Sequence, residues 1–238
     1  MASRRAADEL ISSGSVRVNG ERPPPSGVLI DPSRDTVTVD GRVIKPVTKH
    51  RYVVLNKPLG VITTAKDESD RTTVLDVVGD EGHSGHRLFP VGRLDADTSG
   101  LLLLTDDGDL AFRLTHPRYK VAKEYVVIVI GNLSTADIEA LRTGVKLEEG
   151  MTALAEVEVT AVTPGSRDSV LAELRIVIRE GRHRQVRRMI HVIGRKVHTL
   201  RRTGFGPLKL GRLKAGDWRV LGEAEVAALR RAVGVEQK

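Results

Sequence analysis

The sequence predicts an α+β fold, and three patterns support this prediction. Four consecutive leucines at 101–104 lie between a glycine and an Asp-Asp-Gly turn at 106–108, which is typical of a short strand buried on both faces. A β-branched run over 122–130 and an alternating run over 169–178 predict two further strands. A helix is predicted over 184–193, with apolar residues on one face and basic residues on the other.

The composition is that of a chain that can bury a sizeable core. It has 238 residues, of which 40% are hydrophobic and 29% are charged, as in soluble globular proteins. No apolar run approaches the ~18 residues of a membrane span, and no basic-then-apolar leader is present, so neither a membrane span nor a signal peptide is expected. Cysteine is absent. This excludes disulfides, cysteine-ligated zinc and thiol catalysis, and it fits a cytoplasmic location.

Positive charge is concentrated in one part of the sequence. The formal net charge is +7, and residues 180–220 contain twelve Lys or Arg but only two acidic residues. Such a concentration predicts a surface that binds a polyanion. The alternative is a solvated basic face without a partner. The chain has only three Phe, three Tyr and one Trp, which argues against an RNA-stacking sheet of the RRM kind.

The first 46 residues predict a small module that precedes the main domain. Residues 3–12 read as a short helix, and residues 16–20 as a strand that runs into an Asn-Gly turn. Residues 28–31 and 36–40 are further strand candidates. A linker over 46–50 then separates this module from a second domain, expected over residues 48–235.

The loop before the leucine strand carries a resemblance to a known family. Its sequence, Gly92-Arg-Leu-Asp-Ala-Asp-Thr-Ser-Gly100 followed by the four leucines and Thr105-Asp-Asp-Gly108, resembles the active-site signature of pseudouridine synthases that modify ribosomal RNA. More narrowly, it resembles the RsuA/RluB/RluE/RluF family, and most of all its RluB type. Two other segments resemble motifs of this family, namely Lys123-Glu-Tyr125 and Glu180-Gly-Arg-His-Arg-Gln-Val-Arg-Arg-Met189.

The resemblance implies a fold for both parts of the chain. Residues 48–235 would form a pseudouridine synthase domain with a mixed, mostly antiparallel sheet and helices on its faces. Residues 1–46 resemble the second half of an S4 RNA-binding domain, in which Arg4 and Arg5 would face RNA phosphates. S4 domains begin with a further helix, so we expect a truncated S4-like module.

The resemblance also implies the roles of the site residues. Asp95 would be the catalytic residue, Arg187 its guanidinium partner, and Tyr125 the side chain that stacks on the target base. A carboxylate nucleophile must be ionised, and a nearby guanidinium offsets its desolvation in a closed pocket. Arg93 and Lys123 would complete the substrate-binding set. The RNA-binding set comprises Arg4, Arg5, Arg184, Arg188, Arg201 and Arg202.

The predicted function is the isomerisation of a specific uridine in ribosomal RNA to pseudouridine, with flipping of the target base. The 23S RNA of the large subunit is favoured over 16S RNA, either free or within an assembling subunit. We expect an enzyme without a cofactor, because the reaction involves no redox change and loses no atom. We also expect a monomer. The alternative is a non-catalytic rRNA-binding ribosome-assembly protein that retains the fold.

A cluster of acidic residues raises the possibility of a metal-dependent nuclease. Carboxylates that lie close together are ligands for Mg²⁺. Turn formation at residues 106–108, with Asp109 capping the next helix, explains these residues better, so no metal site is predicted. The cluster comprises Asp97, Asp106, Asp107 and Asp109.

Overall fold

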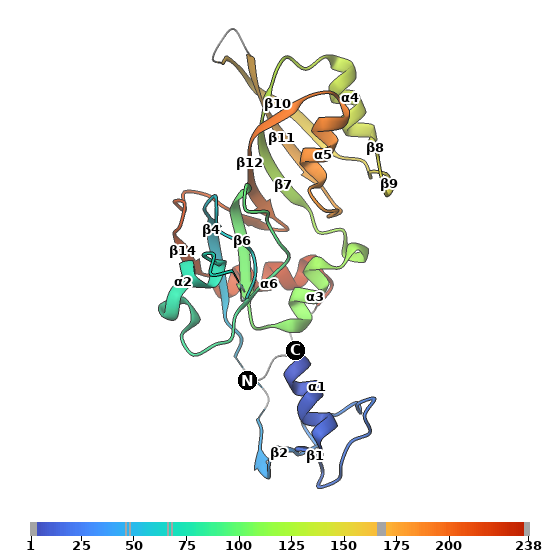
Figure 1. The fold of residues 1–238 in the computed structure, drawn as a ribbon, viewed down its shortest axis with the longest axis vertical. Helices are drawn as coiled ribbons and strands as arrows, with labels where there is room; N and C mark the ends of the chain where they lie inside the picture. Colours follow the sequence, from blue (N-terminus) through green and yellow to red (C-terminus); the bar gives the residue numbers. More distant parts are fainter. Residues whose placement is uncertain are drawn as a thin grey trace. The chain divides into compact units, whose positions relative to one another are not determined.

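The computed structural model describes residues 4–45, 47, 49–65, 67, 69–165 and 170–235 (Figure 1). The chain divides into two compact units, Met1–His50 and Arg51–Lys238. The side chain of Arg4 and parts of the predicted linker lie outside the described residues.

The first unit contains one helix and a small antiparallel sheet. Helix α1 (Arg4–Ser13) precedes strands β1 (Val16–Val18), β2 (Val37–Val39) and β3 (Arg42–Val43), which pair in the order β1-β2-β3. The strand expected over 28–31 is wrong, since these described residues form no strand. The Asp31 amide instead donates to the Asp35 carboxylate at 2.7 Å, and Leu29 is almost fully exposed. A local turn therefore takes the place of strand pairing.

The second unit combines a large sheet with five α-helices in its described residues. Its elements in chain order are β4 (Tyr52–Lys57), α2 (Val74–His83), β5 (Phe89–Pro90), β6 (Ser99–Thr105), α3 (Gly108–Thr115), the 3₁₀ helix η1 (Pro117–Tyr119), β7 (Lys123–Ile130), α4 (Thr135–Thr143), β8 (Lys146–Leu147), β9 (Gly150–Met151), β10 (Glu156–Pro164), β11 (Val170–Ile178), α5 (Gln185–Val192), β12 (Lys196–Phe205), β13 (Leu208–Lys209), β14 (Trp218–Val220) and α6 (Glu223–Ala232). None of the described helices combines the length and apolar content that a membrane crossing requires.

The main sheet is mixed and mostly antiparallel, which confirms the predicted fold class. Its strand order in the described residues is β10-β11-β7-β12-β6-β4-β14, with β13 paired to β12 and β5 paired to β6. The pairing of β12 with β6 is parallel, and the other pairings are antiparallel. Figure 1 shows β7, β10, β11 and β12 in one half of this unit, and β4, β6 and β14 in the other. The parallel pair therefore joins the two halves.

The four leucines of β6 divide the core between the two faces of the sheet. Leu102 and Leu104 pack in a cluster with residues of α2, α4 and α5, while Leu101 and Leu103 pack with residues of α3 and α6. All four side chains have no exposed surface. The predicted strand buried on both faces is confirmed, and it is a rigid support for the loop that precedes it.

The parallel junction requires a glycine at one position. Gly100 of β6 lies opposite Arg202 of β12, and its φ angle is +108°. A Cβ atom at this position would lie 2.2 Å from the Arg202 carbonyl oxygen and 2.7 Å from its amide nitrogen. The two backbones can approach this closely only because Gly100 has no side chain.

Two helices next to the site, α5 and α3, form where the sequence predicts them, but the cap of α3 differs from the prediction. Helix α5 buries Val186, Met189 and Ile190, as its apolar periodicity predicts. Helix α3 is capped by Asp107, whose carboxylate accepts from the Leu110 amide at 3.0 Å. The predicted cap, Asp109, instead lies in the first turn, where an acidic residue favours the helix dipole.

Candidate active site

The loop over residues 92–98 joins β5 to β6 and carries the predicted catalytic carboxylate. Hydrogen bonds within the loop and to the segment after β4 hold its backbone. These are Thr98 N to Asp95 O at 3.0 Å, Thr63 Oγ1 to Leu94 O at 2.7 Å, and Gly60 N to Ala96 O at 2.8 Å. The loop is therefore fixed by the chain around it as well as by the strand that follows.

A pocket of about 320 Å³ opens beside this loop. Its walls come from the loop over 92–98, from β7 and β12, and from the segment between β11 and α5. Asp95 lies in it with 33% of its side chain exposed, whereas Tyr125 is 8% exposed. Of the predicted site residues, those that line the pocket are Arg93, Asp95, Lys123, Tyr125, Arg184 and Arg202.

Among the described residues, the guanidinium found within ion-pair distance of Asp95 belongs to Arg184, with Nη1 at 3.5 Å from Oδ2. Arg184 also binds both carboxylate oxygens of Asp97, at 3.1 and 2.8 Å, and lowers the pKa of that group. Arg187, predicted to pair with Asp95, contacts Asp97 instead. Arg187 donates to the carbonyl oxygen of Asp97 at 2.6 Å and lies 3.3 Å from the carboxylate of Asp97. Asp97 thus holds both arginines next to the pocket.

Arg202 requires a correction, because its burial does not fit a surface contact with RNA phosphates. Its side chain is 2% exposed, and its Nε donates to the Leu101 carbonyl at 2.8 Å. Burial lowers the pKa of the guanidinium, and an interaction with the Tyr125 hydroxyl opposes this shift. The neighbouring Arg201 is exposed, because successive side chains of a strand point to opposite faces. Arg202 is therefore placed to orient Tyr125 inside the pocket.

Two lysines at the site have lowered pKa values, the partly buried Lys123 and the fully buried Lys57, and the sequence identified only Lys123 as a site residue. Lys123 donates to the Glu180 carbonyl at 3.3 Å, and burial, together with the charge of Arg202, lowers its pKa to about 8. Lys57 has no exposed surface, and burial lowers its pKa to about 8 against the opposing effect of Asp95 and Asp97. Its signal in the sequence is its position before a proline, where β4 ends.

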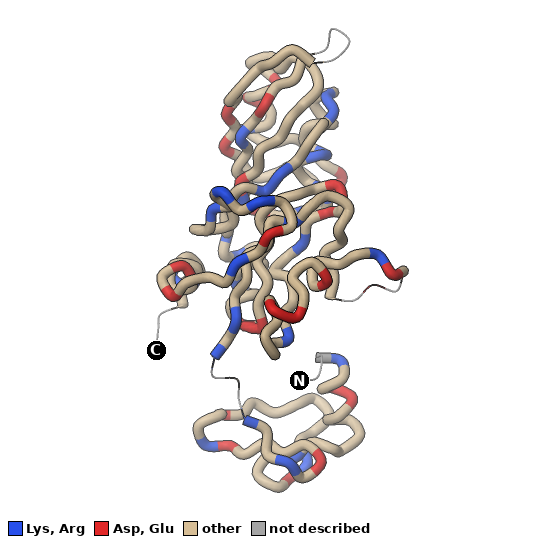
Figure 2. The backbone as a smooth tube through the Cα atoms, turned by 90° about the vertical axis from the view of Figure 1, so that its left-hand side faces the viewer, with Lys and Arg blue, Asp and Glu red and all other residues tan. Residues whose placement is uncertain are grey.

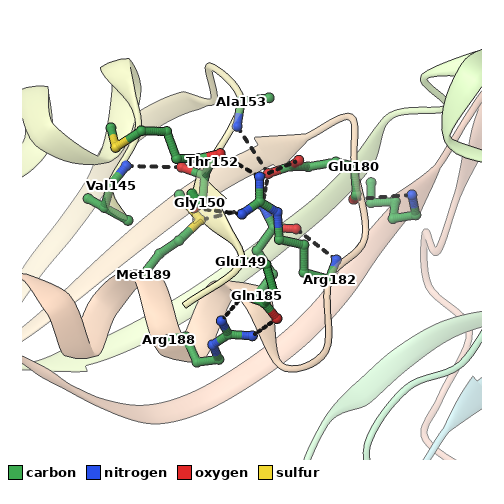
Figure 3. A network of polar contacts seen from close by, with 12 residues as sticks. Val145, Glu149, Gly150, Thr152, Ala153, Glu180, Arg182, Gln185, Arg188 and Met189 are labelled. Carbon is green, nitrogen blue, oxygen red and sulfur yellow. Dashed lines mark hydrogen bonds and ion pairs between the residues drawn. The ribbon is translucent and has the colours of Figure 1, made fainter. Parts of the chain in front are cut away.

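A network of polar contacts fixes the pocket wall that carries Arg184 (Figure 3). Arg182 donates to the Gly150 carbonyl at 2.7 Å and also contacts the Met151 carbonyl. Glu180 accepts from the Ala153 amide at 3.1 Å and from Gln185 Nε2 at 2.5 Å. These bonds tie the segment between β11 and α5 to the β8–β9 hairpin, so the hairpin supports the pocket without lining it.

The basic region over 180–220 is largely paired with acids from elsewhere in the chain. Figure 2 shows basic and acidic positions interleaved along the second unit. Arg188 pairs with Glu149 rather than facing solvent alone. Arg195, Lys209 and Arg219 pair with Asp137, Glu124 and Glu225. Within the described residues, no ion pair is found for four exposed members of the region, Lys196, Arg201, Arg212 and Lys214. Arg5 is also exposed, on α1 of the first unit.

Two carboxylates of the acidic cluster considered as a metal site, those of Asp106 and Asp107, are bound by protein donors. Asp106 accepts from the Arg51 amide at 2.9 Å and pairs with His86 at 2.8 Å. Asp107 accepts from the Tyr52 hydroxyl at 2.7 Å in addition to capping α3. These contacts make the two carboxylates structural groups at the end of β6.

The family of this chain follows from its similarity to known proteins. The family model described as RNA pseudouridylate synthase matches residues 51–192, which include the loop over 92–98, β7 and α5. The chain therefore belongs to the RNA pseudouridylate synthase family, as the resemblance predicts, and it is an enzyme of that class.

Individual relatives cover almost the whole chain. It is 41% identical to an RNA pseudouridine synthase of Aquifex aeolicus, across 99% of this chain and 92% of the relative. It is also 41% identical to the ribosomal large subunit pseudouridine synthase B of Bacillus subtilis, across 97% of this chain and 91% of that protein. A crystal structure of a pseudouridylate synthase superposes with a TM-score of 0.68 at 30% identity, covering 95% of this chain and 94% of the other.

Proposed function

We propose that this enzyme converts one uridine of large-subunit ribosomal RNA to pseudouridine, with Asp95 as the nucleophile or base. The observation that carries this proposal is the position of Asp95 in a pocket that also holds Tyr125 and Arg184. The Bacillus subtilis relative is named for the large ribosomal subunit, which favours 23S over 16S RNA as the substrate.

The chemistry matches the groups in the pocket. The reaction breaks the N1–C1′ bond, forms a C5–C1′ bond, removes the proton from C5 and adds one to N1, so the product is an isomer and no cofactor is needed. The Asp95 carboxylate acts on the target uridine either as a nucleophile or as a general base. Tyr125 stacks on the uracil ring while it is detached from the sugar. Arg184 places its guanidinium beside the Asp95 carboxylate, with Nη1 at 3.5 Å from Oδ2, and so can fix the orientation of that group.

The remaining groups bind the RNA around the target. Flipping a nucleotide out of its stack costs a few kcal/mol, and contacts to the flanking phosphates offset this cost. Arg93 at the pocket mouth and Arg201 on β12 are suited to such contacts, and the first unit would add Arg5 as part of an S4-like module. The enzyme would act as a monomer in the cytoplasm, on free 23S RNA or on an assembling subunit.

The test is to map pseudouridine in ribosomal RNA from cells that lack this gene. One pseudouridine should disappear from 23S RNA and should return with the wild-type gene but not with Asp95→Asn. If no site changes, the proposal fails, and a non-catalytic role in ribosome assembly takes its place. If Asp95→Asn restores the site, Asp95 is not the catalytic group.

A further inference from the structure

A group of aromatic side chains lies on the surface beside the active-site pocket. Helix α3 buries Leu110, Ala111 and Leu114, but Phe112 on its other side is 57% exposed. The Phe112 ring lies 5.1 Å from that of His116, and the His116 ring lies 6.3 Å from that of Tyr119. Tyr119 is partly buried against the core, whereas Phe112 and His116 are exposed, so core packing does not explain the position of the Phe112 ring.

Two basic side chains lie against one of these rings, that of Tyr119. The Arg118 guanidinium lies 4.7 Å from the centre of the Tyr119 ring, and that of Arg113 lies 5.7 Å from it. Arg113 also donates to the Tyr119 hydroxyl at 3.3 Å. These cation–π contacts hold two positive charges at the partly buried Tyr119, in the same aromatic group as the exposed Phe112. Aromatic faces bordered by arginine are the combination that binds single-stranded nucleic acid, in which bases stack and phosphates pair with cations.

Phe112, the most exposed ring of the group, borders a groove that is continuous with the active-site pocket. Phe112 lines this groove together with Phe89 and Thr63, and the groove volume is about 530 Å³. Four residues belong to both the groove and the pocket of Asp95, namely Val91, Gly92, Arg93 and Thr115. A nucleotide strand with one base in the pocket can therefore place a neighbouring nucleotide in the groove.

We infer that this groove binds an unpaired nucleobase of the RNA next to the target uridine, by stacking on Phe112. This inference rests on the proposed function, because it takes the flipped uridine to occupy the pocket of Asp95. Arg93, at the border of the two cavities, pairs with the phosphate that links the two nucleotides. Stacking does not distinguish strongly between bases, so the groove selects for an unpaired residue at this position rather than for a particular base.

The first experiment compares Phe112→Ala and Phe112→Trp with the wild-type enzyme. The probe is unmodified 23S RNA transcribed in vitro, with affinity measured by filter binding and turnover by chemical mapping of pseudouridine. Base–aromatic stacking predicts that Phe112→Ala weakens binding and raises KM roughly 5- to 100-fold, with kcat at saturation retained. Phe112→Trp keeps an aromatic face and should restore wild-type KM. Leu154→Ala removes an apolar side chain that is more exposed than Phe112 but lies outside both cavities, and it should have no effect.

The second experiment identifies the base. In short RNA fragments around the mapped uridine, single abasic residues should reduce wild-type affinity at one neighbouring position. The same abasic fragment should bind Phe112→Ala and wild type equally, because both partners of one contact are then absent. The inference is overturned if the affinity losses from Phe112→Ala and from the abasic residue multiply when the two changes are combined. It is also overturned if Phe112→Ala binds naked RNA as well as Leu154→Ala does, even if Phe112→Ala is defective on ribosomal particles. If wild type binds RNA but forms no pseudouridine, the proposed function fails, and the affinity comparison still decides on the stacking site.

Discussion

The parallel junction between β6 and β12 predicts a large effect from one added methyl group. In Gly100→Ala, the new Cβ would lie 2.2 Å from the Arg202 carbonyl oxygen, well inside ordinary van der Waals contact. The obstructing atoms belong to the backbone, so a side-chain rotation cannot relieve the clash. The strands must separate, and the junction that places the loop over 92–98 beside Tyr125 must open.

The magnitude has two parts. A non-glycine residue at a φ angle of +108° is strained by ~1–3 kcal/mol. Forcing an extra methyl group into a packed site costs a further ~1–3 kcal/mol. The expected loss in the free energy of unfolding is therefore ~2–6 kcal/mol, a large fraction of the ~5–15 kcal/mol that stabilises a typical domain.

The chain offers a matched control for the backbone part. Gly150 has a φ angle of +110°, and a Cβ there would meet no atom within 4 Å. Gly150→Ala should therefore lose only ~1–3 kcal/mol. Urea unfolding followed by the fluorescence of Trp218, the single tryptophan, measures both losses in the second unit. If Gly100→Ala is no less stable than Gly150→Ala, the close approach of the two strands is refuted.

Three further predictions concern chemistry, pH and RNA binding. Asp95→Asn should abolish pseudouridine formation in vitro while RNA affinity is retained; a large loss of affinity would make Asp95 a structural residue. The pKa of Lys57 is about 8 in the folded state against 10.5 ordinarily, so the unfolded state binds the extra proton between these values. The free energy of unfolding should therefore rise with pH from 8 to 10 by up to ~1.4 kcal/mol per pH unit more than in Lys57→Met, and parallel pH profiles would contradict the shift. Arg201→Gln should weaken RNA binding and reduce its salt slope by about 0.9 if one phosphate contact is lost. Arg188→Gln should change the slope less because Glu149 already pairs with Arg188, and equal slopes for wild type and Arg201→Gln would exclude Arg201 from the RNA surface.

The sequence by itself determined several central strands of the sheet and the loop that carries the motif. The leucine run specified β6, because consecutive apolar side chains are typical of a strand that is buried on both faces of a sheet. The period of Val186, Met189 and Ile190 specified the buried face of α5. The motif around Asp95 identified the family, which the similarity to known synthases confirms.

Only the tertiary structure decided which charges face one another. Local periodicity states that a side chain points inward or outward, but not which distant segment it meets. Arg202 was grouped with surface arginines, yet β12 pairs with both β6 and β7, and Arg202 is buried there and interacts with Tyr125. Arg184, and not Arg187, lies within ion-pair distance of Asp95. This depends on where the start of α5 lies relative to the loop over 92–98, because Arg184 and its partner Asp97 are 87 residues apart in the sequence.

The same reason explains the basic region and the aromatic group. The charge of residues 180–220 was counted along the chain, whereas in space Glu149 and Asp97 are brought against it. A count of aromatic residues argued against an RNA-stacking sheet of the RRM kind, and it could not show that the turn from α3 into η1 brings Phe112 close to His116 and His116 close to Tyr119. Composition measures how many groups a chain has, and the fold determines which of them share one surface, because contacts between distant segments depend on the path of the backbone.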